Sequence, residues 1–184
     1  LALKSTRDIK SSPSQWDLNK IIIQELQFLK AVTHFQGVMI RTSLSSDVSP
    51  VIGFGIDYSL ALGTLLRAAM ESLSLSEKKE LLISTRPMKD HILLEMQTSS
   101  DHYFKEHLAR LVDPLYSSGD SEDRKESDIG ISIAKYYFES FGGKLDIGHT
   151  EKGLLIRIRI PCIQEDDSIK REVAAASTEN SAIL

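Results

Sequence analysis

The residues with the clearest chemical meaning form a glycine turn that runs directly into an amphipathic helix, Asp128-Ile-Gly-Ile131. This helix is expected to end at the glycine pair Gly142-Gly143. A helix N-terminus presents free backbone N–H groups, and a glycine lets a ligand come close to the backbone. Taken alone, the pattern predicts a phosphate-binding site around Gly130.

Asp128 weakens that prediction. Aspartate is a good N-cap, because its carboxylate accepts hydrogen bonds from the same N–H groups that a phosphate would use. The polar run before it carries more acids than bases: Asp120, Glu122, Asp123 and Glu126 against Arg124 and Lys125. We expect residues 117–127 to be a solvated loop whose charge disfavours a triphosphate.

Composition limits the function classes. The 184 residues, 41% hydrophobic and 26% charged, are enough for one globular core. A net charge of -4 gives no global attraction for nucleic acid or an anionic membrane, so we expect neither partner. No apolar run has the length of a membrane span, and no signal-peptide pattern begins the chain. Cys162 is the single cysteine, which favours a reducing, cytoplasmic compartment.

Hydrophobic periodicity predicts three helices. The first begins after Asp17 and ends at Gly37, and the second spans about 59–75. The third follows Asp128, and a further short helix is expected near 103–111. The first helix is expected to bury Ile22, Ile23, Leu26, Leu29 and Val32, and the second to bury Leu62, Leu65, Leu66, Ala69 and Leu73.

Alternating apolar residues predict the strands. One strand covers about 38–42, and a hairpin joins 80–84 to 91–97 through a turn at 86–90. A second hairpin joins 144–147 to 154–160 through a turn at 150–153. In its last strand Leu154, Ile156, Ile158 and Ile160 share one face.

This order of elements predicts the fold class and the domain limits. We expect an α/β two-layer sandwich, in which a mixed sheet carries about three helices on one face. Residues 1–15 are interpreted as a linker or the end of an upstream helix, 16–163 as the domain, and 164–184 as a mobile C-terminal tail. Because the chain begins at Leu1 without a methionine, we expect it to be part of a longer protein.

Four segments in this order carry a resemblance to a known family. They are Trp16-Asp-Leu-Asn-Lys-Ile-Ile22, Pro50-Val-Ile-Gly-Phe-Gly-Ile-Asp57, Asp113-Pro-Leu-Tyr116 and Gly142-Gly-Lys-Leu-Asp-Ile147. Together with the Asp128 helix, they resemble the catalytic, ATP-binding domain of bacterial sensor histidine kinases, of the GHKL superfamily. The resemblance covers about 16–162 and implies the same sandwich fold.

The resemblance also implies where a nucleotide would bind. Counted from Asp57, the family's two helix asparagines fall at Arg67 and Glu71, the second of which would hold Mg²⁺. A carboxylate can ligate Mg²⁺, but residues four apart on a helix can also pair, and we expect an ion pair between Arg67 and Glu71. Asp128 stands where the family has an earlier glycine, while Gly130 is retained.

On the adenine side, Thr98 stands where the family has an aspartate, and Ser99 and Ser100 stand where it has glycines. Losing a charge-assisted hydrogen bond weakens binding by ~1.5–3 kcal/mol, which is roughly tenfold to a hundredfold in affinity. Three of the matched nucleotide positions, Glu71, Thr98 and Asp128, are therefore substituted.

The phosphate-accepting histidine of the family is not matched. The resemblance places it on a helical hairpin upstream of Leu1, which would also supply dimerisation. None of the histidines in the chain has matching surroundings: His34, His91, His102, His107 and His149.

Two functions remain open. The favoured one is a non-catalytic docking module of a two-component system, without a cofactor, whose partner is a response regulator, a kinase or its own upstream hairpin. The alternative is a divergent ATP-binding domain of a protein histidine kinase, using Glu71 for Mg²⁺ and Gly130 for the phosphates. A phosphotransfer protein whose acceptor histidine lies outside the chain is compatible with the first.

Overall fold

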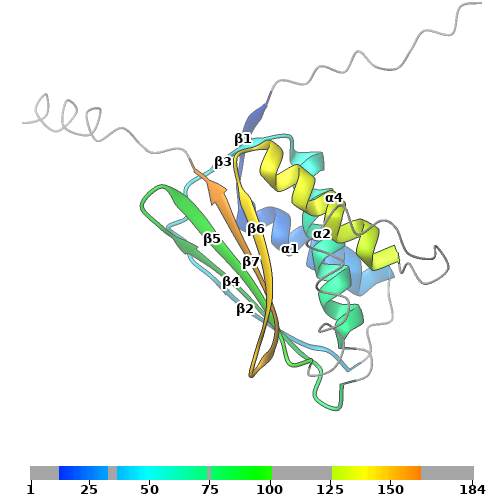
Figure 1. Cartoon of the computed structure of the whole chain (residues 1–184). Helices are drawn as coiled ribbons and strands as arrows, with labels where there is room; N and C mark the ends of the chain where they lie inside the picture. The colour runs from blue at the N-terminus through cyan, green and yellow to red at the C-terminus, as the bar shows by residue number, and fades with distance from the viewer. Residues whose placement is uncertain (1–12, 33–36, 74–75, 101–125, 163–184) are drawn as a thin grey trace, which may run out of the picture.

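The computed structural model describes residues 13–32, 37–73, 76–100 and 126–162. They form a two-layer α/β sandwich, in which the helices cover one face of a five-stranded mixed sheet (Figure 1). The helices are α1 (Leu18–Val32), α2 (Gly55–Ser72) and α4 (Glu126–Ser140). The predicted fold class is confirmed.

The five-stranded sheet has the order β2-β4-β5-β7-β6. Its strands are β2 (Met39–Leu44), β4 (Glu80–Pro87), β5 (His91–Thr98), β6 (Lys144–Thr150) and β7 (Gly153–Pro161). Strand β2 pairs parallel to β4, and the other neighbours are antiparallel. Both predicted hairpins, β4–β5 and β6–β7, are therefore present.

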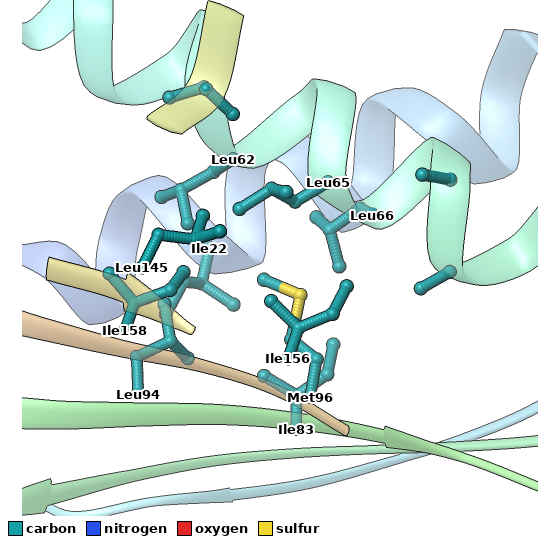
Figure 2. Close-up of a cluster of buried hydrophobic side chains, with 14 of the residues drawn as sticks. Ile22, Leu62, Leu65, Leu66, Ile83, Leu94, Met96, Leu145, Ile156 and Ile158 are labelled. Carbon is teal, nitrogen blue, oxygen red and sulfur yellow. The ribbon is translucent and has the colours of Figure 1, made fainter. Parts of the chain in front are cut away.

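The core lies between the sheet and the helices. In Figure 2 the side chains of β4, β5 and β7 point towards those of α1 and α2. Because side chains alternate along a strand, Leu154, Ile156, Ile158 and Ile160 all share the buried face, as predicted. The side chains labelled in Figure 2 are Ile22, Leu62, Leu65, Leu66, Ile83, Leu94, Met96, Leu145, Ile156 and Ile158.

Two details of the helices differ from the prediction. In α1, Ile21 is buried and Ile23 is 44% exposed, because each residue turns 100° further around the helix and Ile23 passes beyond the buried face. Helix α2 begins at Gly55, earlier than predicted, directly after the extended residue Phe54. Its predicted core residues are all buried: Leu62, Leu65, Leu66, Ala69 and Leu73.

A small two-stranded sheet was not predicted. Strand β1 (Ser14–Trp16) pairs antiparallel with β3 (Val51–Gly53). The Trp16 indole donates a hydrogen bond to the Gly53 carbonyl at 3.0 Å. A Cβ at Gly55 would lie 2.7 Å from the indole ring, so the ring packs directly against the start of α2. Strand pairing in the described residues thus includes Ser14, two residues before the predicted start of the domain.

Several predictions fall outside the described residues. These are the linker over residues 1–12, the short helix near 103–111, the segment Asp113-Pro-Leu-Tyr116, most of the loop 117–127, and the tail 164–184. Among the helices that the structure describes, none is long and apolar enough to cross a membrane.

Candidate functional site

The predicted nucleotide positions gather around helix α2. Helices α2 and α4 run antiparallel, since Tyr58 near the start of α2 packs against Phe138 near the end of α4, while Thr64 meets Gly130 near the start of α4. Strand β5 ends beside the other end of α2, where the Thr98 hydroxyl lies 3.5 Å from the hydroxyl of Ser72. The fold therefore places Thr98 of β5 and Gly130 of α4 beside α2, which carries Glu71.

Thr98 is a buried neutral residue. It is only 1% exposed, and its hydroxyl accepts a hydrogen bond from the Ser100 backbone N–H at 3.4 Å. The neighbouring Ser72 hydroxyl is also buried and donates to the Ala69 carbonyl at 2.7 Å. The polar groups at this position thus have partners within the protein, although the contacts to Thr98 are long.

The turn after β5 is tied down by its own side chain. The Ser99 hydroxyl accepts a hydrogen bond from the Glu80 backbone N–H at 3.0 Å and donates to the Lys78 carbonyl. The Ser99 N–H donates to the Glu80 carbonyl, also at 3.0 Å. Where the resemblance expects glycines that open the backbone to a ligand, Ser99 instead fastens the turn to the beginning of β4.

Gly153 is a contact that sequence reasoning missed. A Cβ at this position would lie 2.3 Å from the Thr98 carbonyl oxygen and 2.7 Å from the Ser100 nitrogen, and the residue has φ +120°. Both the backbone conformation and the lack of space require glycine. The only signal in the sequence was an isolated glycine in the turn between two strands. The β6–β7 turn therefore closes over the backbone of 98–100.

Gly130 is half-buried where α4 lies against α2. A Cβ added there would lie 2.3 Å from Thr64 Cγ2, far inside van der Waals contact. The Thr64 hydroxyl donates to the Leu60 carbonyl at 2.7 Å, which fixes the direction of its methyl group. The glycine allows α4 to approach α2, and this packing explains the residue without any ligand.

Asp128 lies on helix α4. The described part of this helix starts at Glu126, so the backbone at Asp128 is already helical and does not stand before the helix as predicted. A negative residue remains at the helix end where the resemblance would place phosphate.

The predicted ion pair between Arg67 and Glu71 is not formed. Both residues lie in the described part of α2, but no Arg67–Glu71 contact is among its ion pairs. Arg67 is exposed and Glu71 is half-buried, and an exposed helical pair gains too little to fix two long side chains. Within the described ranges, no three histidine, cysteine or acidic residues lie close enough together to hold a metal ion.

No protein-family model matches the chain. Over 151 residues, 81% of its length, the chain is 22% identical to the sensor protein FixL of Bradyrhizobium diazoefficiens, of which the aligned part is 29%. The chain thus spans less than a third of that relative.

Solved structures of histidine kinases share the sandwich. A nucleotide-free catalytic domain of the histidine kinase ThkA superposes with a TM-score of 0.66 at 16% identity, covering 82% of this chain and 97% of that one. The mycobacterial sensor histidine kinase MprB gives 0.62 at 15%, with 82% and 97% covered. The histidine kinase AdeS of Acinetobacter baumannii gives 0.61 at 14%, with 86% and 71% covered.

Proposed function

Because the chain has the fold of a sensor histidine kinase catalytic domain, we propose that it serves two-component signalling as a protein-docking module that does not depend on bound nucleotide. Its partner is a response regulator, a kinase or a helical hairpin upstream of Leu1. With its single cysteine, Cys162, free, the domain suits the reducing cytoplasm.

The observation that carries this proposal is the environment of Thr98. A buried hydroxyl, 1% exposed, stands where the resemblance expects the carboxylate that recognises adenine. Its neighbours Ser72 and Ser100 and the close approach of Gly153 fill the space around it with protein atoms. A neutral, packed position supplies neither the charge nor the access that adenine recognition needs.

The retained glycine does not argue against the proposal. Gly130 is explained by its contact with Thr64, since any side chain there would collide with α2. The same region carries Asp128 on α4, and a carboxylate repels a triphosphate. The residues present therefore fit an ATP–Mg²⁺ site poorly.

One observation favours the alternative of a functional ATP-binding domain. None of the ion pairs among the described residues joins Glu71 to Arg67, and a carboxylate is an oxygen ligand suited to Mg²⁺. In this alternative the domain would belong to an active protein histidine kinase, with its acceptor histidine on another segment.

Thermal unfolding with and without Mg²⁺-ATP separates the two. A ligand at 100 times its dissociation constant adds ~2.7 kcal/mol of stability, which raises the Tm of a domain of this size by roughly 5–10 °C. We expect no Mg²⁺-dependent rise. A rise in the unmodified domain that disappears in Glu71→Gln, but persists in the control Glu77→Gln, would establish the alternative.

A gain-of-binding variant tests which residues prevent nucleotide binding. If Glu71 and Asp128 together block binding, the double variant Glu71→Asn, Asp128→Gly acquires a Mg²⁺-ATP-dependent rise in Tm. If it does not, while remaining folded, then the packing around Thr98 is the block. The exposed residue Glu77, changed to Asn, serves as the matched control for charge.

A further inference from the structure

The face of the sheet opposite the helices carries a set of charged side chains. In Figure 1 helices α1, α2 and α4 all lie on one side of the five strands. Since side chains alternate along each strand, the residues between the buried ones point to the other side. Along β4, β5, β7 and β6 six of these outward residues are joined by ion pairs, and we call them the charged face: Arg86, Glu95, Arg157, Arg159, Asp146 and Lys144. Glu80, which also points outward at the start of β4, is paired separately with Lys78 at 3.0 Å.

Each carboxylate of the charged face is shared by two cations. Glu95 accepts from Arg86 and, at 2.9 Å, from Nε of Arg157. Asp146 accepts from Nη2 of Arg159 at 2.6 Å, and Nζ of Lys144 lies 3.5 Å from its other oxygen. Two acids therefore hold four bases. The charged face carries a net charge of +2, from four cations minus two anions, in a chain whose net charge is -4.

The cations lie outermost around Glu95. The Glu95 side chain is 16% exposed, whereas the side chains of Arg86 and Arg157 are 59% and 46% exposed. A molecule approaching this part of the sheet therefore meets guanidinium groups first. Their positions are held by Glu95 beneath them, so little side-chain entropy remains to be lost on binding.

The guanidinium groups keep donors for a further acceptor. Arg157 contacts Glu95 through Nε, and Arg159 contacts Asp146 through Nη2, while each guanidinium has five N–H donors in a planar fork. Arg157 and Arg159 stand two residues apart on β7, which is about 6.8 Å. An extended peptide places the side chains of alternate residues at the same spacing and on the same side.

Arg41 extends this basic surface towards the edge of the sheet. It lies on β2 in register with Leu82 of β4, and it is exposed. Its Nη2 donates to the sulfur of Met39 at 3.4 Å, a contact that leaves its charge uncompensated. The spacing of Arg157 and Arg159 on β7 equals that of alternate residues in an extended peptide, which favours a protein segment as the occupant.

We propose that the charged face docks an extended acidic segment of a partner protein, with carboxylates at alternate residues that pair with Arg157 and Arg159. This inference specifies the partner chemistry of the docking role proposed above and rests on that role. It places the docking surface on the side of the sheet opposite the helices, away from the positions around α2.

Fluorescence anisotropy with a synthetic peptide tests the proposal. The probe is an extended, labelled dodecapeptide with glutamate at alternate positions. The control peptide has glutamine at the same positions. We expect saturable binding of the glutamate peptide at about 50 mM salt, weakening at least tenfold at about 200 mM, and no binding of the glutamine peptide. A labelled single-stranded oligonucleotide that binds more tightly than the glutamate peptide would overturn the choice of partner.

Variants locate the binding site. Arg157→Gln with Arg159→Gln should weaken peptide binding at least tenfold, whereas the exposed turn residue Lys152, changed to Gln, should alter it less than twofold. If the double variant does not fold, Arg157→Lys retains the charge but loses the planar fork, and it should weaken binding about threefold or more. Equal losses in Lys152→Gln and Arg157→Lys would refute the proposed site.

The same titration is repeated with saturating Mg²⁺-ATP. Peptide binding together with a nucleotide-dependent rise in Tm would retain the charged face and reject the nucleotide-independent function. No peptide binding together with no nucleotide effect would reject docking at the charged face and leave the nucleotide-independent function standing.

Discussion

Replacement of Gly130 by alanine distinguishes a packing glycine from a phosphate-binding one. The added Cβ would lie 2.3 Å from Thr64 Cγ2, a distance that real Cβ atoms do not show, so the helices must separate or Thr64 must move. Overpacking of this kind costs about 1–3 kcal/mol. The better helix propensity of alanine returns up to about 1 kcal/mol. With the full return, we expect a net loss of up to about 2 kcal/mol.

Urea unfolding followed by circular dichroism measures that loss. A second substitution gives the mechanism: Thr64→Ser removes Cγ2 and the collision with it. The double variant Gly130→Ala, Thr64→Ser should therefore be more stable than Gly130→Ala alone, with a coupling energy of about 1 kcal/mol. Gly148→Ala is the control, because an added Cβ there meets nothing within 4 Å.

The result that refutes this reasoning is specific. If Gly130→Ala stabilises the domain, as alanine does in an unhindered helix, then Gly130 is not needed for the contact between α2 and α4. Its presence would then require another explanation, and the phosphate-binding alternative would gain support.

Three further predictions follow from the contacts. Gly153→Ala should destabilise the domain by about 3 kcal/mol or more in urea unfolding, since its φ is +120° and its Cβ would meet the Thr98 carbonyl at 2.3 Å; a loss below about 1 kcal/mol would contradict the close approach. Burial opposes ionisation of Asp146, but the hydrogen bond from Arg159 and the charges of Lys144 and Arg159 lower its pKa below 3.8. The Asp146 carboxylate therefore stabilises the fold above pH 3.8, and this stabilisation is lost as the pH falls through the folded pKa. Asp146→Asn should reduce the loss of stability on acidification. An unchanged acid profile would count against the ion pair between Asp146 and Arg159. Burial raises the pKa of Tyr58 from 10.0 to about 12, so stability should fall as the pH rises between these values, and Tyr58→Phe should remove that fall while losing the 2.9 Å hydrogen bond to Ile52; a fall retained in the variant would assign it to another group.

The sheet and helices could be predicted because one face of each element is buried. The alternation of Leu154, Ile156 and Ile158 can satisfy only a strand with one face in the core, and the structure buries all three. Strand β1 has only three residues, too few for a period, and its pairing depends on β3, about 37 residues away. Such a strand has no local signal.

The candidate site was less predictable because its contacts are tertiary. A sequence gives Gly130 and Gly153 as turn residues, but the atoms that exclude a side chain at each position belong to Thr64 and to the backbone of Thr98. The predicted pairing of Arg67 with Glu71 rested on helical spacing, which allows an ion pair without making it stable. The roles of Glu71, Thr98 and Asp128 remain predictions.

The central claim, that docking by this domain does not depend on nucleotide, is tested most directly by calorimetric titration of the purified domain with ATP in the presence of Mg²⁺. The environment of Thr98 predicts no saturable heat up to about 1 mM ATP. Saturable binding with a micromolar Kd that requires Mg²⁺ and is lost in Glu71→Gln would contradict the claim and identify a working ATP site.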